Sequence, residues 1–399
     1  MEKLRLEILP NYFLKDDKTF DRQRTLEFCG KIAGVCYDKE GFSSLVNEPI
    51  EKTEKRIANT INNGHHSVYD HVMLNFNIKN IPKILSMVIN NEKQYTTSEK
   101  SGRYTKVVGN KNSVITDLEE ELYNKWFEIL KQKIEEEYGT VFSKFKIKTL
   151  AQENARSFVT VFMPTEMIYS TTLRQINYIA SWMNDYIVKA KTNNIDFEIK
   201  LASSMEDFCN ELRRLNVLED GLMKNEKDRS LSLFGTNLAN KKEIFTDLYA
   251  TTYKGSYAQY AQAQRHRTIN YQLERLDKEE YYIPPIIVDD KELVNEWLND
   301  CEKVKDLYPI GQLVLIRETG TYEDFILKCK ERLCSAAQLE IMLQTKKTLQ
   351  KYKTATKDID ALIYNNIDNY TKGARCTFKD FKCNMDCKFK EGKNLNRKI

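Results

Sequence analysis

The sequence lacks the features that mark membrane-spanning, disordered and secreted chains. No stretch approaches 18 consecutive apolar residues, so no segment is expected to span a bilayer. Proline and glycine are scarce, with 7 and 14 among 399 residues, and 41% of the residues are hydrophobic, which excludes collagen-like and wholly disordered chains. The first residues show no apolar signal core, and the cysteines number nine, which is odd. We therefore expect a folded cytoplasmic protein with reduced thiols.

The chain also lacks a strong charge of either sign. Its 62 basic and 58 acidic side chains leave a net charge of +4, too weak over this length to indicate a general nucleic-acid or membrane-surface binder. Residues 372–399 alone carry nine basic and three acidic side chains, so the remainder is close to neutral. A DNA-binding protein built on the cationic segments is an alternative that a steep salt dependence of affinity would support.

Local patterns predict several helices and strands. Apolar residues alternate with polar ones over residues 72–78, which predicts a strand, and Pro82 stands where a helix should begin. A Thr-x-x-Glu capping box opens a predicted helix over residues 116–139. Helical spacing predicts a further helix over residues 165–187 and one of roughly nine turns over residues 321–352.

A weak internal repeat suggests a tandem chain, as its length of 399 residues allows. The repeated features are Ala155-Arg156, Pro164 and a helix with Arg174 in the first part, and Lys305, Pro309 and a helix with Arg332 in the second. We predict a first half over residues 1–203, a second half over 204–354, and a basic, cysteine-containing tail over 355–399.

The four histidines lie in only two places, residues 65–71 and position 266. His266 stands between Arg265 and Arg267, and residues 248–273 contain no Asp or Glu that could pair with these arginines locally. Guanidinium groups match phosphate oxygens bidentately, so the pattern indicates a phosphorylated ligand. A basic surface patch explains the same residues about equally well.

A second stretch without acidic residues follows Glu99 and contains Ser101, Gly102 and Arg103. Gly102 permits close backbone approach, Ser101 offers a hydroxyl and Arg103 a guanidinium fork, as in a phosphate clasp. By itself the segment is also typical of an ordinary turn. No glycine-rich Walker or dinucleotide fingerprint is present, so a P-loop or Rossmann site is not expected.

With these motifs the chain resembles the flavin-dependent thymidylate synthases over most of residues 30–350. The family signature, Arg-His-Arg followed by Asn-Glu-x-Ser-x-Arg-Tyr, is split between the halves. Residues 64–71 resemble its histidine-rich segment and residues 99–104 its second part, but residues 91–93 read Asn-Glu-Lys where Arg-His-Arg is expected. The second half has Arg-His-Arg at residues 265–267 and an aromatic-Ile-Pro at 282–284, but lacks the clasp.

The later family segments divide in the same way. The first half keeps Arg156 and Arg174, whereas Met183 stands at the position of the pyrimidine-contacting arginine. The second half has that arginine as Arg332, whereas Lys305 replaces the upstream one. The resemblance implies an α+β fold of two tandem halves, each a sheet packed with long helices, that form an intramolecular pseudo-dimer with one composite site.

The resemblance also implies the reaction, the reductive methylation of dUMP to dTMP with FAD, NADPH and methylenetetrahydrofolate. Arg332 is the implied catalytic residue, because its charge would stabilise the ionised pyrimidine. The implied substrate-binding residues are Gln262, Arg265, Glu99, Ser101, Gly102, Arg103, Arg156 and Arg332. The implied FAD-binding residues are His65, Ser67, Glu99, Arg174, Arg265, His266 and Arg267. A homodimer of tandem chains is implied, with dUMP and folate as ligands and no membrane or specific nucleic acid as partner.

Two questions stay open at this point. Cys376, Cys383 and Cys387 offer three thiolates, but a structural zinc site needs four ligands and their spacing matches no standard knuckle, so no metal is predicted. Thr172, which replaces a usual Asn, and Met183 leave room for a flavoenzyme that modifies another pyrimidine nucleotide. A nucleotide-binding pseudoenzyme is the alternative if the chain does not hold FAD.

Overall fold

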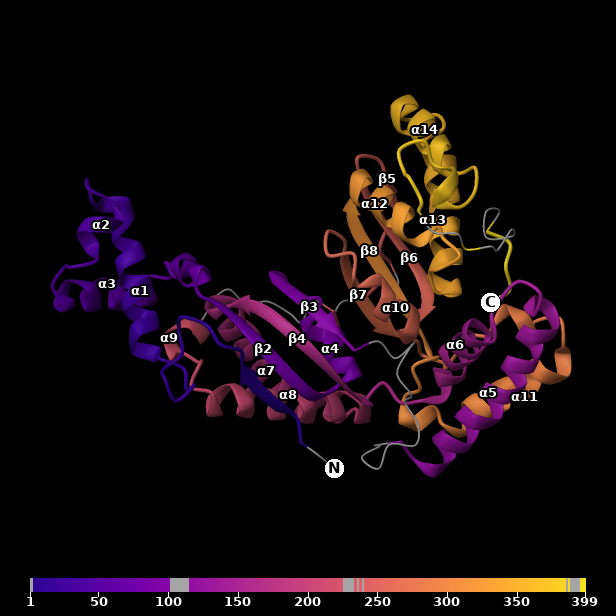
Figure 1. The fold of residues 1–399 in the computed structure, drawn as a ribbon, viewed down its shortest axis with the longest axis horizontal. Helices are drawn as coiled ribbons and strands as arrows, with labels where there is room; N and C mark the ends of the chain where they lie inside the picture. Colours follow the sequence, from indigo (N-terminus) through magenta and orange to yellow (C-terminus); the bar gives the residue numbers. More distant parts are fainter. Residues whose placement is uncertain are drawn as a thin grey trace. The chain divides into compact units, whose positions relative to one another are not determined.

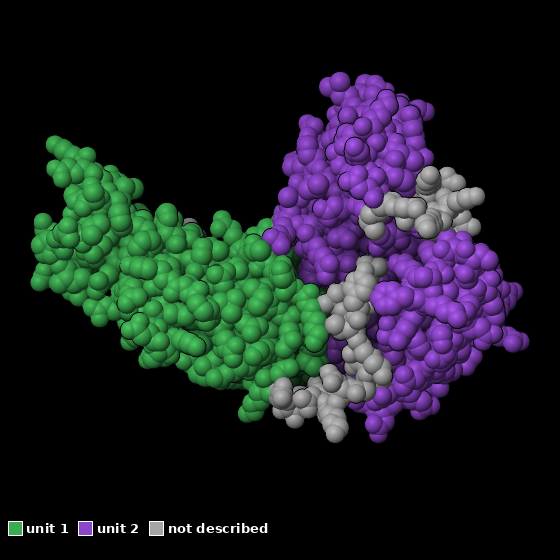
Figure 2. All heavy atoms as spheres, viewed as in Figure 1, with its two compact units in different colours: residues 1–100, 164–231 green, residues 101–163, 232–399 purple. Residues whose placement is uncertain are grey.

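The protein is described by a computed structural model in which the chain divides into two compact units. The described residues are 3–100, 115–224, 233–234, 237–238, 240–384, 387 and 395–399. Unit 1 comprises residues 1–100 and 164–231, and unit 2 comprises residues 101–163 and 232–399 (Figure 2). Each unit contains a four-stranded antiparallel sheet with helices packed against it, an α+β architecture (Figure 1). Among the described residues, no helix is long and apolar enough to cross a membrane.

The sheet of unit 1 has the strand order β1-β2-β4-β3. Its strands are β1 (Arg5–Ile8), β2 (Met73–Pro82), β3 (Tyr95–Glu99) and β4 (Pro164–Thr172). The predicted strand at residues 72–78 is confirmed by β2, because the alternating side chains of Val72, Leu74, Phe76 and Ile78 are all fully buried. Helix α4 (Lys83–Ile89) begins directly after Pro82, as predicted.

The other helices of unit 1 flank this sheet and extend beyond it. They are α1 (Arg22–Gly34), α2 (Phe42–Leu45), α3 (Ile50–Asn62), α7 (Leu173–Asn193), α8 (Asp196–Arg214) and α9 (Asp220–Met223). The helix predicted from residue 165 is wrong at its start, because residues 164–172 form β4 and helix α7 begins only after the cap at Thr172. Alternate residues of β4, from Thr165 to Thr171, are buried, which is the period of a strand with one face on the core.

The sheet of unit 2 repeats the strand order of the first, as β5-β6-β8-β7. Its strands are β5 (Ile244–Phe245), β6 (Leu248–Ser256), β7 (Asn270–Arg275) and β8 (Leu313–Thr321). Met73 pairs with Thr172 in the first sheet, and Leu248 pairs with Thr321 in the second. Both threonines cap the helix that follows, so Thr172 corresponds to Thr321 and Met73 to Leu248. We call residues matched by this alignment sister positions.

The helices beside the second sheet are α10 (Tyr257–Ala263), α12 (Tyr322–Arg332), α13 (Leu339–Thr356) and α14 (Ala361–Ile367). The predicted nine-turn helix is therefore wrong, because α12 ends at Arg332 and six residues separate it from α13. The connection is held by distant backbone and side-chain groups. The Arg375 amide donates to the Leu333 carbonyl at 2.7 Å, and Arg397 Nη2 donates to the Ala337 carbonyl at 2.5 Å.

A helical layer in unit 2 joins segments from both predicted halves. It consists of α5 (Asp117–Tyr138), α6 (Lys144–Ala155) and α11 (Lys291–Lys303). The predicted capping box at the start of α5 is confirmed. The ring centroids of Trp126 and Trp297 lie 4.8 Å apart, and the indole of Trp126 donates to Asp300 at 2.9 Å. The predicted boundary at residue 203 falls inside α8, so repeat halves and compact units divide the chain differently.

Two short segments of unit 2 exchange hydrogen bonds in a reciprocal pattern. The Val161 amide donates to the Tyr308 carbonyl at 2.8 Å, and the Ile310 amide donates to the Val159 carbonyl at 2.7 Å. The number 149 is the difference between positions 321 and 172; adding it to 161 gives 310, and subtracting it from 308 gives 159. The two bonds are therefore related as a pair of equivalent contacts across a two-fold axis would be.

The described part of the tail packs on unit 2. Arg397 is buried, and Ile399 belongs to the aromatic core around α5 and α11. The backbone amide of Lys398 donates to the hydroxyl oxygen of Tyr138 at 3.0 Å. Cys376 and Cys387 are exposed and Cys383 is half-buried, and no three metal-ligating side chains gather among the residues that the structure describes.

Candidate functional site

Helix α10 positions the first group of predicted site residues. Ser256 caps the helix, since its hydroxyl accepts from the Gln259 amide at 3.0 Å. The amide and hydroxyl of Ser256 in turn donate to the two carboxylate oxygens of Glu340, at 2.7 and 2.5 Å. Every residue of α10 is buried. The helix is thus fixed at its start, and the Arg-His-Arg segment follows its end.

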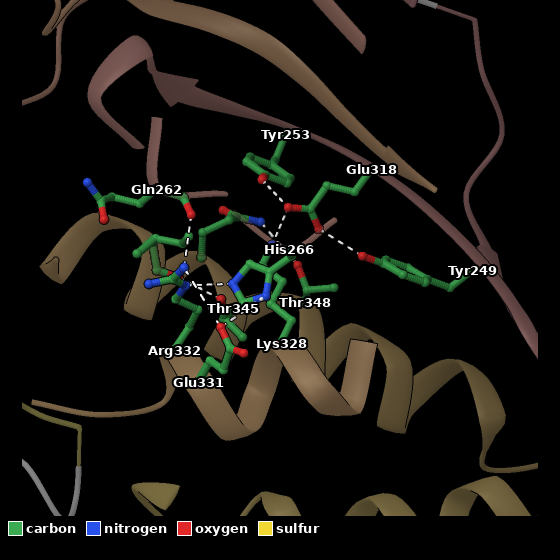
Figure 3. Close-up of polar contacts among 12 residues, drawn as sticks. Tyr249, Tyr253, Gln262, His266, Glu318, Lys328, Glu331, Arg332, Thr345 and Thr348 are labelled. Atoms are coloured by element: carbon green, nitrogen blue, oxygen red, sulfur yellow. Dashed lines mark hydrogen bonds and ion pairs between the residues drawn. The ribbon is translucent and has the colours of Figure 1, made fainter. Parts of the chain in front are cut away.

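Arg332 lies at the end of α12 and bonds to two predicted site residues (Figure 3). Its Nε donates to Nε2 of His266 at 2.6 Å, and its Nη2 donates to the backbone carbonyl of Gln262 at 3.0 Å. Its side chain is largely buried. Two hydrogen bonds from two nitrogens of a planar guanidinium fix both its position and its plane. The structure therefore brings Gln262, His266 and Arg332 together in unit 2.

His266 is held in its neutral form. Burial, the Arg332 guanidinium and the Lys328 ammonium lower the pKa of its imidazole well below the ordinary value. A neutral ring that accepts at Nε2 carries its proton on Nδ1, and Nδ1 lies 3.4 Å from a carboxylate oxygen of Glu331. The ring thus lies between Glu331 and Arg332: it accepts from Arg332 at Nε2, and its Nδ1 faces the Glu331 carboxylate.

The two arginines beside His266 differ from it in exposure. Arg265 and Arg267 are both exposed, and among the described residues Arg265 makes no hydrogen bond or ion pair. The acidic neighbour of the segment is not local in the sequence: Glu331 approaches His266 from α12. An exposed guanidinium beside a buried scaffold is suited to an anionic ligand.

Arg156 belongs to unit 2 as well, although it comes from the first half of the sequence. It directly follows α6 and is 5% exposed, and its charge lies near the hydroxyl of Tyr123. Burial raises the pKa of Tyr123, so this phenol remains neutral at physiological pH.

A buried ion pair lies beneath the His266–Arg332 contact. Lys328 on α12 donates to Glu318 on β8, and both side chains are almost completely buried. The hydroxyls of Tyr249 and Tyr253 donate to the two oxygens of Glu318 at 3.1 and 2.5 Å (Figure 3). Burial and the Glu318 charge raise the pKa of both tyrosines well above the ordinary value, so they act as donors.

The remaining described site residues lie in unit 1. Glu99 ends β3 and accepts from Lys83 Nζ at 2.6 Å and from the hydroxyl of Ser86 at 3.0 Å. Arg174 donates to Asp70 at 2.8 Å while remaining about half exposed. The other oxygen of Asp70 accepts from the hydroxyl of Thr172 at 2.7 Å.

His65 and Ser67 are both exposed, in the segment between α3 and β2. The clasp residues Ser101, Gly102 and Arg103 lie outside the described residues.

Sequence reasoning missed five residues that hold the site together. Glu331, Lys328 and Glu340 are ordinary charged residues in helical sequence, and nothing local distinguishes them from solvated ones. Asp70 stands in the histidine-rich segment, but its partner Arg174 is 104 residues away. A charged residue within an otherwise apolar pattern was the available signal for Glu318 and Lys328.

One family model matches part of the chain. Residues 19–187 match the family model described as thymidylate synthase complementing protein. No curated protein matches the chain. Among solved structures, the chain is similar to thymidylate synthase X from Helicobacter pylori with FAD and dUMP, at 16% identity and a TM-score of 0.30, over 55% of this chain and 99% of that one.

Proposed function

Because the chain belongs, through residues 19–187, to the thymidylate synthase complementing proteins, a family of flavin-dependent methyltransferases, we propose that it converts dUMP to dTMP. The reaction is a reductive methylation in which methylenetetrahydrofolate gives the one-carbon unit and NADPH is the reductant. FAD, once bound, supplies the redox chemistry. The observation that carries this proposal for the unmatched second half is the orientation of Arg332 by His266 and Gln262.

Arg332 acts on the pyrimidine ring of dUMP. Its Nε and one Nη are engaged by His266 and by the Gln262 carbonyl, so the guanidinium is oriented before the substrate arrives. A preorganised positive charge stabilises negative charge that develops on a uracil ring as its C5 becomes nucleophilic. The exposed Arg265 binds the phosphate of the same nucleotide, together with the buried Arg156 and the clasp at residues 101–103.

The residues present fit FAD by the chemistry of their donors. Arg174 and Arg267 are partly or fully exposed cations suited to a pyrophosphate, and His65 and Ser67 add exposed polar groups. Arg174 is paired with Asp70, so an incoming anion competes with that carboxylate for the guanidinium. His266 and Glu99 would orient the nucleotide and flavin rings.

The chain works as a pseudo-dimer with one composite site. Three observations support this arrangement: the shared strand order of the two sheets, the reciprocal bonds between residues 159–161 and 308–310, and the complementary losses at Met183 and Lys305. We further propose that two chains pair as a homodimer in the cytoplasm. Light scattering coupled to gel filtration tests that assembly.

The test of the function is the visible absorbance spectrum of the purified protein, followed by the addition of NADPH under anaerobic conditions with and without dUMP. We expect about one flavin per chain, bleaching by NADPH, and dTMP formation when methylenetetrahydrofolate is added. A colourless protein that takes up no FAD would overturn the proposal.

Variants then test the composite site. Arg265→Ala and Arg103→Ala should each weaken dUMP binding by roughly tenfold to a hundredfold, since each removes a charge-assisted hydrogen bond. Lys305→Ala is the matched control, because it changes a cation of the mirror site that has lost its partners. Equal effects of all three variants would contradict a single composite site.

A further inference from the structure

The buried pair of Lys328 and Glu318 calls for an explanation other than stability. Lys328 is 1% exposed and Glu318 is fully buried, with two tyrosine hydroxyls completing the hydrogen bonds of the carboxylate. Removing two charges from water costs several kcal/mol per ion, and replacement of such a pair by apolar side chains is often neutral or stabilising. A protein that keeps the pair has no clear gain in stability from it.

The first sheet shows that this fold does not need the pair. The sister positions of Glu318 and Lys328 are Tyr169 and Ile179, which follow from the alignment of Thr172 with Thr321. The sister positions of Tyr249 and Tyr253 are Leu74 and Ile78. All four sister residues are fully buried. Unit 1 has the same strand order, with helix α7 after β4 as α12 follows β8. It builds this arrangement around an apolar core.

The buried ion pair of Lys328 and Glu318 occurs beside the second sheet, in the unit that also contains His266 and Arg332. The sister position of Arg332 is Met183, and Glu92 stands in the first half where His266 stands in the second. Where the histidine and arginine are lost, the ion pair beneath them is replaced by apolar residues as well. The two features therefore vary together between two copies of one fold within a single chain.

We propose that Lys328 and Glu318 are positioning residues that hold Arg332 in its working orientation by acting through His266. The proposal rests on the proposed function only in naming Arg332 as the group that meets the pyrimidine. The geometry links them through α12: Lys328 donates to Glu318, Arg332 follows Lys328 by one turn on the same helix, and Arg332 Nε donates to His266 Nε2 at 2.6 Å.

The physical reason is the lone pair on His266 Nε2. If the imidazole were protonated, Nε2 would become a donor and would repel the guanidinium that now donates to it. The ammonium of Lys328, one turn before Arg332 on α12, disfavours that second proton. Glu318 and the tyrosine hydroxyls keep this ammonium fixed in the core rather than free to reach solvent.

Several elements that the structure describes bring charged groups toward the ring, and Arg265 and Arg267 flank His266 in the chain. Helix α12 contributes Lys328, Glu331 and Arg332, and strand β8 contributes Glu318 behind the lysine. Strand β6 contributes the two neutral tyrosines, and helix α13 contributes the uncharged Thr345 and Thr348 (Figure 3). The Glu331 carboxylate lies 3.4 Å from Nδ1 and favours a charged ring, whereas the lysine disfavours it. Loss of Lys328 should therefore move the titration of His266 upward.

The test uses Lys328→Met combined with Glu318→Gln, which removes both charges and keeps the side-chain lengths. Nitrogen-15 NMR of the full chain labelled at histidine reports the protonation of His266, whose signals are identified by their loss in His266→Gln. We expect a pKa of His266 higher by roughly one unit than in the parent. With dUMP as substrate, the acid limb of the kcat–pH profile should lie about one pH unit higher than in the parent, with little loss at pH 8 and an unchanged flavin content.

Two further variants separate positioning from folding. Exchange of the four residues for their sister residues, Tyr249→Leu, Tyr253→Ile, Glu318→Tyr and Lys328→Ile, should keep the melting temperature and show the same titration and kcat effects. Adding His266→Gln to the double variant restores a permanent acceptor for Arg332 Nε, so kcat should lose its pH dependence. Lys353→Met with Asp368→Asn, an ion pair on α13 and the segment after α14, is the control and should change neither quantity.

A His266 titration and a kcat–pH profile identical to those of the parent in the double variant would overturn the proposal. So would a loss of kcat that is equal at all pH values and accompanied by a lower melting temperature, because that is the result of a merely structural pair. If the parent binds no FAD, the proposed function fails, but the NMR titration still decides whether Lys328 controls His266.

Discussion

Glu340 holds Ser256 by both of its carboxylate oxygens, one bonded to the amide at 2.7 Å and the other to the hydroxyl at 2.5 Å. The pair joins the start of α13 to the start of α10, 84 residues apart. Because Glu340 is buried away from cations that could neutralise it, burial raises the pKa of its carboxyl to about 7. The anchor of the site helix is therefore sensitive to pH.

This anchor predicts a pH dependence of stability. The folded-state pKa of about 7 lies above the ordinary value of 4.5, so the folded protein keeps a proton that the unfolded chain releases between these values. The stabilisation is complete below pH 4.5 and declines as the pH rises to about 7, by at most roughly 3 kcal/mol. Glu340→Gln keeps an oxygen acceptor without the charge, so its free energy of unfolding should decline less.

Urea unfolding between pH 5 and pH 8 measures the difference between parent and variant. Glu128→Gln, at an exposed position on α5, is the control and should follow the parent. Parallel curves for the parent and Glu340→Gln would show that the carboxyl is ionised throughout this range.

The variant Arg332→Lys tests how far kcat falls when the planar guanidinium is lost and the positive charge is kept. A lysine at this position cannot donate to His266 and Gln262 at once and still present a second edge to the substrate. We expect kcat for dTMP formation to fall by about a hundredfold, with flavin content unchanged. Lys347→Met, an exposed residue of α13, serves as the control. A variant with kcat within a factor of about two of the parent would remove Arg332 from the catalytic role.

The sequence predicted those parts of the fold that depend on local pattern. The strand β2, the helix after Pro82 and the capping box at Thr116 all follow from periodicity and capping within a few residues. The strand β4 was missed because its residues fit a helical spacing, and only burial against β2 and β3 selects the period of two. The break after Arg332 carries no glycine or proline and is held by Arg375 and Arg397, which no local pattern can reveal.

The residues of the candidate site also differ in whether the sequence alone could reveal them. Arg265 and His266 stood out by residue type and spacing and Arg332 by the family resemblance, and the structure brings the last two into contact. The residues that set their protonation and orientation, Glu331 and Lys328, became visible only when α10 and α12 were packed together. Contacts between elements that are about 65 residues apart carry no signature in a single sequence.

Because Arg174 and Asp70 form an ion pair, we expect substitution of the arginine to weaken FAD binding and substitution of the aspartate to strengthen it. Arg174→Gln removes a cation for the pyrophosphate and should weaken FAD binding by roughly tenfold. Asp70→Asn removes the competing anion and keeps an oxygen for the hydroxyl of Thr172, so FAD binding should strengthen by up to about fivefold. Titration of the apoprotein with FAD, followed by flavin fluorescence, measures both constants. A weakening in both variants would mean that the pair supports the helix cap rather than the cofactor.

The hydrogen bonds of Asp300 predict how strongly α5, from the first sequence half, is held to α11, from the second. Its buried carboxylate accepts from the Trp126 indole at 2.9 Å and from Lys125 and Lys303 at 2.5 and 2.7 Å. Although burial alone would raise it, the pKa of Asp300 is lowered by these donors, so the stabilisation is present above pH 3.8 and is lost as the pH falls through the lower folded-state value.

Asp300→Ala leaves the indole N–H and a half-buried ammonium without their acceptor, and should cost about 3 kcal/mol of unfolding free energy at pH 7. Asp300→Asn still accepts from Trp126 and should cost about half as much. Urea unfolding followed by tryptophan fluorescence reports the change directly, because Trp126 and Trp297 are in contact. Asp289→Asn, an exposed carboxylate before α11, is the control. If Asp300→Ala unfolds at the same urea concentration as this control, the packing of Trp126 on Trp297 alone holds α5 to α11.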